Sequence, residues 1–450
     1  MQSLTPTTQP VLPQAFCAAM QALLGNETPD FLHAIMQEPV VSIRCNDKVP
    51  VQVEGCQPVP WCEHAYYLPK RPQFTLDPLF HGGAYYVQEA SSMFLYQALK
   101  QYVSTNASVL DLCAAPGGKS TLAAHYLTDG LLVANEVVRS RAYILAENLQ
   151  KWGTPNVAVT NNYPVDWGRF TAQFDAILVD APCSGEGMFR KDSGAITEWS
   201  PENVAMCAQR QREIISDVWD ALKQGGVFIY STCTYNTDEN EDNVRWMQEE
   251  LGAEYLPVQI QPEWNITTWG AGYRFLPHKT KGEGLFMAVL RKTDGYLAPK
   301  KVKGKHAASS SAQVLPRELH SYLLTDRAPL LLQDSIWCAV HPEHLSLMQQ
   351  IQARLRVMYM GVELAQQKGK SWIPQPSLAL TKLLRRESFN QVSLSKEEAL
   401  CYLRGEALAL QEVPIGYVLL LFNNLPLGWV KHLGNRSNNL YPNEWRIRYL

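Results

Sequence analysis

Short apolar runs alternate with helix-like stretches from about residue 107 to residue 291, and no other feature constrains the fold as strongly. The runs are rich in β-branched residues and end in small or turn-forming ones, as buried parallel strands do. Repeated strand–helix units predict a Rossmann-like α/β core, with a parallel sheet covered by helices on both faces. We expect strands at 108–113, 131–136, 157–160, 174–179, 226–230 and 285–290, and helices ending near 125, over 140–152 and over 201–223.

Two of the predicted strands lead into turns that contain a cysteine. The first continues into DAPCSG at 180–185, which holds Cys183, and the second into STCTYN at 231–236, which holds Cys233. Chemistry in open α/β sheets gathers at the carboxyl ends of the strands. A structural thiol belongs inside an apolar run, whereas these two fall just after one. Neighbouring strands lie about 5 Å apart, so we predict a reactive pair that can reach one substrate group.

The first predicted strand leads into the glycine-rich segment DLCAAPGGKS at 111–120. An ordinary strand–helix turn is one interpretation. A nicotinamide site lacks its G-x-G-x-x-G spacing here, and a nucleotide P-loop fits only at Gly118-Lys119-Ser120, since Cys113 stands where its first glycine should be. The next strand ends at Glu136, which suits the ribose hydroxyls of a nucleoside. We therefore interpret the segment as a site for an adenosine-containing cofactor, whose atoms the glycines let the backbone approach.

Composition limits the remaining possibilities. With 450 residues, 46% of them apolar and 18% charged, the chain is globular and long enough for two or three domains. A net charge of −3 gives no general positive field, so nucleic-acid binding would need local basic clusters. Ten irregularly spaced cysteines, a polar start unlike a signal peptide and no apolar stretch long enough for a bilayer favour a cytoplasmic protein without membrane contact.

Changes in composition divide the chain. We expect an N-terminal α+β domain with a bridge to the core (1–102), the Rossmann-like core (103–293), a lysine- and serine-rich linker (294–314) and a C-terminal region (315–450) that ends in a β-rich piece. The first domain should contain helices at 13–24 and 30–37 and strands at 40–44 and 49–53.

Taken together, these segments resemble the RNA (cytosine-5) methyltransferases of the Sun type, and among them the bacterial enzymes that act on small-subunit rRNA. The resemblance covers nearly the whole chain. It rests on RCN at 44–46, QEASSM at 88–93, the glycine-rich segment, DAPCSGEG at 180–187, STCTYN at 231–236, RFLPH at 274–278 and the C-terminal stretch from PLGW at 426–429 to Arg448.

The resemblance implies S-adenosylmethionine as the cofactor, with Glu136 on its ribose and Asp180 between the cofactor and the target base. The cofactor would be cradled by Cys113, Ala114, Ala115, Pro116, Gly117, Gly118 and Lys119. It also implies that Cys233 is the nucleophile and that Cys183 assists product release. The family usually carries an Asp near the adenine after the third strand, where this chain has Tyr163; Asn162 or Asp166 would substitute for it.

The chemistry suits these residue types independently. Carbon 5 of cytosine is too weak a nucleophile to take a methyl group directly, but a thiolate added to carbon 6 makes carbon 5 reactive. Asp180 would then need to be protonated or to share its proton with the ring nitrogen at position 3. Asn236 or Thr237 resembles the cap of a helix that would favour a thiolate at Cys233, but acidic residues fill its first turn, so we expect weak activation.

RNA contacts are expected at two places. Arg190 and Lys191 would hold a phosphate or form a solvated pair, and the C-terminal part, PUA-like by the resemblance, offers Lys431, Arg436 and Arg446 beside aromatic residues. Of Trp429 and Trp445, at least one should be core, and His278 would face substrate or serve structure. No metal site is expected, because Cys45, Cys56, Cys62 and His64 lack ligand spacing.

Three functions remain open at this point. The leading one is a monomeric enzyme that makes 5-methylcytosine in RNA, with 16S rRNA as the expected substrate. A catalytically idle RNA-binding assembly factor would need neither thiol. A P-loop nucleotide hydrolase is disfavoured by Cys113 and by the absence of its metal and water-positioning partners.

Overall fold

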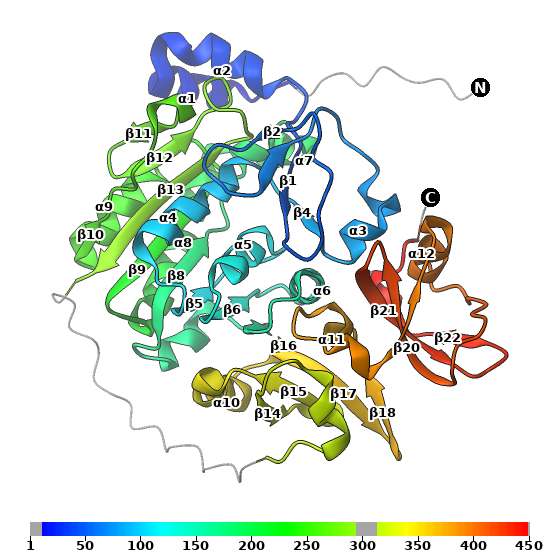
Figure 1. Ribbon diagram of the computed structural model, residues 1–450. Helices are drawn as coiled ribbons and strands as arrows, with labels where there is room; N and C mark the ends of the chain where they lie inside the picture. The colour runs from blue at the N-terminus through cyan, green and yellow to red at the C-terminus, as the bar shows by residue number, and fades with distance from the viewer. Residues whose placement is uncertain (1–10, 294–312, 449–450) are drawn as a thin grey trace, which may run out of the picture.

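The computed structural model describes residues 11–293 and 313–448, and its centre is a ten-stranded sheet. The strand order is β11-β12-β13-β9-β8-β5-β6-β7-β16, with β10 beside β13 (Figure 1). Five central strands are parallel: β5 (Ser108–Asp111), β6 (Leu131–Asn135), β7 (Val157–Thr160), β8 (Phe174–Asp180) and β9 (Leu222–Thr232). Each strand of this group coincides with a predicted apolar run, so the Rossmann-like α/β core is confirmed.

The edges of the sheet are antiparallel, which the strand–helix pattern did not predict. On one side the chain returns through β10 (Ala253–Tyr255), β11 (Thr267–Trp269), β12 (Gly272–Phe275) and β13 (Leu285–Lys292). On the other side β16 (Val357–Met360) pairs with β7, although it follows the predicted linker. Antiparallel neighbours such as β11 and β12 need no crossover helix, so a short connection joins them.

Helices cover both faces of the sheet. One face packs against α4 (Leu95–Tyr102), α5 (Gly118–Tyr126) and α6 (Arg139–Trp152), and the other against α8 (Pro201–Val218), α9 (Glu241–Glu250) and α10 (Leu345–Arg354). Side chains along a strand alternate between these two cores, as Val109 and Leu110 of β5 show. No helix in the two described ranges has the length and apolarity to cross a membrane.

The N-terminal unit begins with α1 (Gln14–Leu24) and α2 (Thr28–Ile35), which lie at the top in Figure 1. Its small sheet has the order β2-β3-β1-β4, built from Gln57–Pro58, Ala65–Tyr67, Ser42–Cys45 and Tyr85–Val87. The strand expected at 49–53 is wrong, because this segment, which holds Pro50, is a loop whose valines pack on the small sheet. Short helices α3 (Pro78–His81) and α7 (Ser193–Glu198) complete this side of the molecule.

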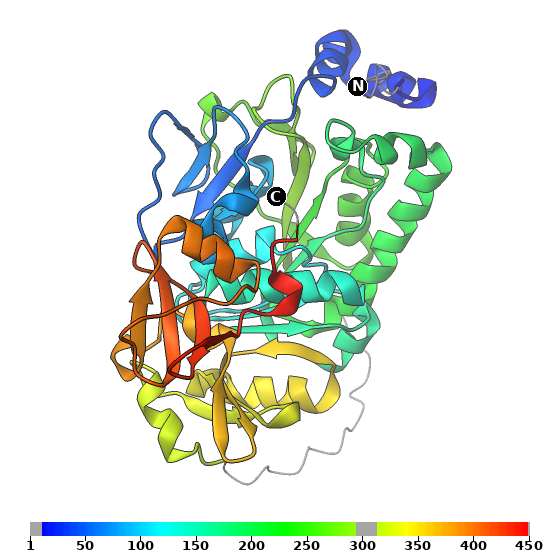
Figure 2. The ribbon, with the colours of Figure 1, turned by 90° about the vertical axis from the view of Figure 1, so that its right-hand side faces the viewer.

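The C-terminal region forms two further sheets beside the core (Figure 2). The first contains β14 (Ala328–Leu331), β15 (Ile336–Val340), β17 (Val362–Lys368) and β18 (Ser371–Pro374), and is followed by α11 (Pro376–Leu380). The second contains β19 (Asn390–Ser393), β20 (Gly416–Phe422), β21 (Leu425–His432) and β22 (Ser437–Asn439), with α12 (Lys396–Leu403) packed on it. Most of the predicted linker, 294–312, lies outside the described residues.

Candidate active site

The strand order reverses between β5 and β8, and the loops that follow β5, β8 and β9 meet at that edge of the sheet. Ligands of open α/β sheets bind at such a switch point. The parallel register places Asp180, the last residue of β8, opposite Ser231 of β9. Both cysteine-containing turns therefore leave the sheet side by side.

Cys183 and Cys233 are in direct contact, with their sulfur atoms 3.2 Å apart. Both side chains are half-buried, and neither forms a disulfide. The contact with Cys233 and, after it, burial raise the pKa of Cys183 well above its usual value. Cys183 is thus held as a thiol, able to give or pass a proton, beside a second sulfur atom.

Asp180 is the polar centre of the site. Its Oδ1 atom lies 2.8 Å from Nζ of Lys119 and accepts a hydrogen bond of 2.7 Å from the hydroxyl of Ser231. Burial acts to lower the pKa of Lys119, but the Asp180 carboxylate outweighs it, so the pKa is raised. Cys233 adds to this effect, so the side chains of Lys119 and Cys233 lie close enough to interact electrostatically. The sequence did not indicate this pairing.

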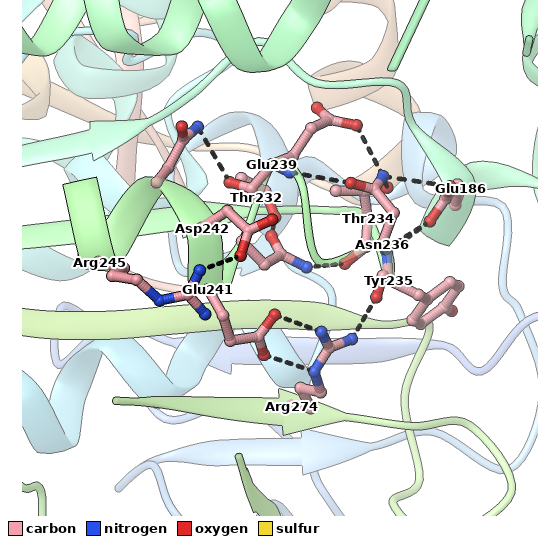
Figure 3. Close-up of polar contacts among 12 residues, drawn as sticks. Glu186, Thr232, Thr234, Tyr235, Asn236, Glu239, Glu241, Asp242, Arg245 and Arg274 are labelled. Carbon is pink, nitrogen blue, oxygen red and sulfur yellow. Dashed lines mark hydrogen bonds and ion pairs between the residues drawn. The ribbon is translucent and has the colours of Figure 1, made fainter. Parts of the chain in front are cut away.

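The backbone around Cys233 is fixed by the loop after β8. The N–H of Gly187 donates to the Cys233 carbonyl at 2.8 Å, and a Cβ at Gly187 would lie 2.9 Å from that oxygen. The Glu186 carboxylate accepts from the N–H groups of Tyr235, at 2.6 Å, and Asn236, at 3.0 Å (Figure 3). The two cysteine-containing loops therefore form one rigid unit.

The Glu239 carboxylate also joins the two cysteine-containing loops. The sequence did not predict this role for Glu239. Its carboxylate accepts from the Ser184 N–H at 3.0 Å, the Gln211 side chain at 2.7 Å and the Asn236 side chain at 2.8 Å. Burial raises the pKa of Glu239, although these donors act in the opposite direction. The only signal in the sequence was an acidic residue at an apparent helix start.

The predicted helix cap at Asn236 or Thr237 is wrong. Asn236 caps a turn by accepting from the Glu239 N–H at 2.9 Å, and α9 begins later, at Glu241. Arg274 of the RFLPH segment pairs with the Glu241 carboxylate through Nε at 2.7 Å and also donates to the Tyr235 carbonyl (Figure 3). The helix start thus positions the loop that follows Cys233 through Arg274.

The glycine-rich loop is held against the end of β6 and contains one backbone conformation that favours glycine. The Ala114 N–H donates to the Asn135 carbonyl at 2.9 Å, and Gly117 has a φ of 115°, which favours glycine. Asp111 is buried; its Oδ2 accepts from Ser120 at 2.7 Å, whereas Oδ1 has no partner in the described structure. Burial raises the pKa of Asp111 to about 7. An unpaired buried carboxylate oxygen suits a cationic ligand group.

Glu136 follows β6, where a ribose would be held, and its carboxylate is almost fully buried. Oε1 accepts from the Val138 N–H at 2.8 Å, and Arg141 lies 3.6 Å from Oε2. The Asn162 side chain points to Arg356 and not to Glu136. Its amide side chain pairs with the peptide group of Arg356, with bonds of 3.0 and 3.1 Å, so it is not free for an adenine.

Tyr163 and Asp166 also bear on the expected adenine contact. The Tyr163 side chain is 66% exposed, and Asp166 accepts from the Tyr163 N–H at 3.2 Å as part of a capping box. Tyr163 brings no carboxylate to this position, and Asp166 uses one of its two carboxylate oxygens in the cap, so a role of Asp166 near the adenine stays a prediction. Tyr163 stays available as an aromatic face.

One expected phosphate contact is not in place. The side chain of Arg190 is 7% exposed, lies 3.5 Å from the Glu283 carboxylate and donates to the Ala34 carbonyl at 2.7 Å. It joins the N-terminal helices to the core, so its assignment to RNA is wrong. Lys191 is exposed and keeps that role as a prediction.

The C-terminal cations differ from one another. Arg436 is exposed, and Lys431 lies half-buried with its ammonium 5.5 Å from the centre of the Tyr417 ring. Arg446 packs over Gly405, and its Nε is buried without a partner among the described atoms. Arg436 is the most exposed of the three, and the role of all three toward RNA stays a prediction.

Packing bears on two residues whose roles the sequence left open, Trp429 and His278. Trp429 is 1% exposed and donates to the Gln375 carbonyl at 2.9 Å, so it is the expected core tryptophan. His278 lies 3.2 Å from Glu27 and packs edge-on against Phe31, which gives it a structural role. In the residues that the structure describes, no group of three or more His, Cys, Asp or Glu side chains is arranged to hold a metal.

Three family models match this chain. They are described as 16S rRNA methyltransferase RsmB/F (98–291), the N-terminal domain of 16S rRNA methyltransferase RsmF (12–90) and the methyltransferase RsmF PUA domain (389–447). Each match falls on a separate part of the fold: the central sheet, the N-terminal unit and the last small sheet.

Curated relatives carry the same description over most of their length. The chain is 34% identical to ribosomal RNA small subunit methyltransferase F of Escherichia coli O157:H7, over 86% of this chain and 84% of the relative. The relative from strain O81 is 32% identical over 96% of both chains. Among solved structures, NSun6 of Pyrococcus horikoshii with SFG has a TM-score of 0.55 at 20% identity and covers 64% of this chain and 100% of NSun6, so it supports the fold alone.

Proposed function

Because this chain belongs to the RsmF family of 16S rRNA methyltransferases, we propose that it transfers a methyl group from S-adenosylmethionine to carbon 5 of a cytosine in 16S rRNA. The single observation that carries the choice of carbon 5 is the contact between Cys183 and Cys233, 3.2 Å apart beside Asp180. Methylation of a base nitrogen or a ribose oxygen needs no thiol, whereas carbon 5 requires a covalent activator.

Cys233 acts as the nucleophile. Its sulfur bonds to carbon 6 of the cytosine, the electrons of the 5,6 double bond form a 4,5 double bond, and those of the 3,4 double bond move to the ring nitrogen at position 3. That nitrogen takes a proton from Asp180, whose carboxylate must first take one up when the base binds. S-adenosylmethionine supplies the electrophilic methyl group when it is bound. Lys119 stabilises the thiolate before attack and the Asp180 carboxylate after its proton has moved.

Cys183 serves the second half of the reaction. The proton on carbon 5 must leave, the 5,6 double bond must form again, and the bond between carbon 6 and the Cys233 sulfur must break. Cys183 lies 3.2 Å from the Cys233 sulfur and, held as a thiol, can relay that proton. It gives its own proton to the leaving Cys233 sulfur and takes up the carbon-5 proton in exchange. It therefore acts in release.

The glycine-rich loop and Glu136 are the residues that would hold the cofactor. The unpaired Asp111 oxygen and the carboxylate of Asp180 suit its positive charge, and Glu136 suits the ribose hydroxyls. Lys431 and Arg436 of the PUA-like part, with Lys191, would bind RNA phosphates. An idle scaffold explains neither the paired thiols nor the Lys119–Asp180 ion pair.

Bisulfite sequencing of 16S rRNA tests this function. RNA from a deletion strain is incubated with the purified chain and S-adenosylmethionine, either naked or as small-subunit particles. One cytosine that becomes resistant to conversion is the expected result. Methyl incorporation without any resistant cytosine would overturn the carbon 5 assignment. Titration adds a check against a P-loop hydrolase, because S-adenosylmethionine should bind and ATP should not.

A further inference from the structure

A segment from beyond the linker lies against the cofactor loops. The amide side chain of Asn162 pairs with the peptide group of Arg356: Oδ1 accepts from the Arg356 N–H at 3.0 Å, and Nδ2 donates to its carbonyl at 3.1 Å. The Asn161 N–H donates to the same carbonyl at 3.0 Å. Arg356 directly precedes β16, which extends the central sheet beyond β7.

The contacts continue from Asn161 to the loop after β6. Its Nδ2 donates to the carbonyls of Glu136, at 2.8 Å, and Val137, at 2.9 Å. The Asn161 side chain is buried, with 9% exposure, and its Oδ1 faces the Arg356 guanidinium at 3.4 Å. The backbone of the loop that carries Glu136 is thus held by a residue that Arg356 holds in turn.

A second branch reaches the glycine-rich loop. Asn135 donates to the carbonyl of Asn162 at 3.0 Å and to that of Leu112 at 3.1 Å, and its own carbonyl accepts from Ala114. Asn135 is 1% exposed, so these bonds replace hydration that the buried groups have lost. Displacing Asn162 would leave buried polar groups unpaired on both sides of the cofactor position.

We propose that the C-terminal region supports the cofactor site from outside, with Arg356 and Asn162 as positioning residues for the Glu136 loop. The inference rests on the proposed cofactor, and the geometry that carries it is the bidentate pairing of Asn162 with the Arg356 peptide group. No atom of Arg356 needs to touch the cofactor. The region after the linker then positions a cofactor loop of the core in addition to binding RNA.

Asn162→Ala removes both bonds to Arg356 and adds no group to the pocket. Binding of S-adenosylmethionine to the full chain, measured by calorimetry, should weaken by about three- to tenfold, the effect of one or two lost hydrogen bonds. The KM for the cofactor should rise by the same factor while kcat stays near its original value. A purely structural role would instead lower kcat with the folded fraction.

Two contacts at the opposite ends of the same strands supply matched controls. Arg327 donates to Asn156, just before β7, at 3.2 Å, and His344 lies 2.9 Å from the carbonyl of Asp129, before β6. Arg327→Ala and His344→Ala should lower the melting temperature about as much as Asn162→Ala but leave cofactor affinity unchanged. Equal weakening by all three variants would overturn the inference in favour of general destabilisation.

Hydrogen exchange gives a readout that is independent of activity. The amides of Glu136 and Val138 should exchange faster in Asn162→Ala than in the original chain, and should do so without cofactor. An Asn162→Ala chain with unchanged affinity overturns this inference alone. An original chain that binds no S-adenosylmethionine overturns the proposed function and this inference with it.

Discussion

Asp111 is a buried carboxyl group at the start of the glycine-rich loop, and its burial disfavours the charged form. Burial raises its pKa to about 7 from an ordinary value of 3.8, and the Ser120 hydroxyl only partly opposes that effect. A group with a raised folded-state pKa contributes stability that is complete below about pH 4 and is lost as the pH rises through about 7.

Asp111→Asn tests that sign. The melting temperature of the original chain should fall relative to the variant as the pH rises from about 4 to about 7, with a constant difference above that range. Thermal unfolding in a series of buffers measures the difference. A difference in melting temperature that stays constant across the whole pH range would show that the pKa of Asp111 is not raised by folding.

Cys233 carries the attack in the proposed reaction and does not form the cofactor loop. Cys233→Ala should therefore lower methylation by at least about a thousandfold while cofactor affinity stays within about twofold. Cys401→Ala is the control, because Cys401 lies on α12, which packs on the last small sheet. Radiolabelled methyl transfer and calorimetry check both. Substantial methylation by Cys233→Ala would show that the nucleophile is misassigned.

At the scale of elements, the loop after β8 sets the position of the loop after β9. Gly187→Ala places a Cβ 2.9 Å from the Cys233 carbonyl, so one of the two loops must move. We expect kcat to fall by about ten- to a hundredfold, because small displacements of a catalytic group are expensive.

Gly168→Ala is the matched control for that variant. Its Cβ would lie 3.2 Å from the Asp217 carbonyl, in a contact with α8 that includes neither cysteine-containing loop. It should leave kcat unchanged, and both variants should stay folded by circular dichroism. A Gly187→Ala enzyme with full activity would show that the contact does not set the position of Cys233.

The elements that the sequence predicted well are those with a strong local signal. The strand at 157–160 matches β7 residue for residue, because its apolar run is bounded by turn residues on both sides. The helix cap predicted at Asn236 was wrong, because the Asn236 side chain accepts from the Glu239 N–H and donates to the Glu239 carboxylate in a turn before the helix. Only folding brings that carboxylate between the two loops, so the sequence could not indicate it. The pairing of β16 with β7 joins residues about 200 positions apart, beyond the reach of any local pattern.

At the scale of the molecule, the division of the chain at the linker stays a prediction, but the two sides share a core. Met348 and Ile351 of α10 are fully buried in the same cluster as Val133 and Ala158 of the central sheet. The β7 edge is also covered by β16. Removing the C-terminal region would therefore expose both an apolar face and an unpaired strand.

A chain ending at residue 293 should melt at least about 10 °C below the full chain, or precipitate on concentration. The control is a full chain with a protease site inserted within 300–311 and cut after folding. Its two pieces should elute together and keep cofactor affinity. A truncated chain as stable as the full one would show that the shared core contributes little.

The covalent mechanism is the central claim, and Cys183 tests it most directly. Cys183→Ala should still allow attack by Cys233 and methyl transfer, but it lacks the group that completes release. Incubation with 16S rRNA and S-adenosylmethionine, followed by denaturing electrophoresis, should show a protein–RNA adduct. The adduct should require the cofactor and be absent from the Cys183→Ala/Cys233→Ala double variant. A folded, active Cys183→Ala enzyme that forms no adduct would contradict the account.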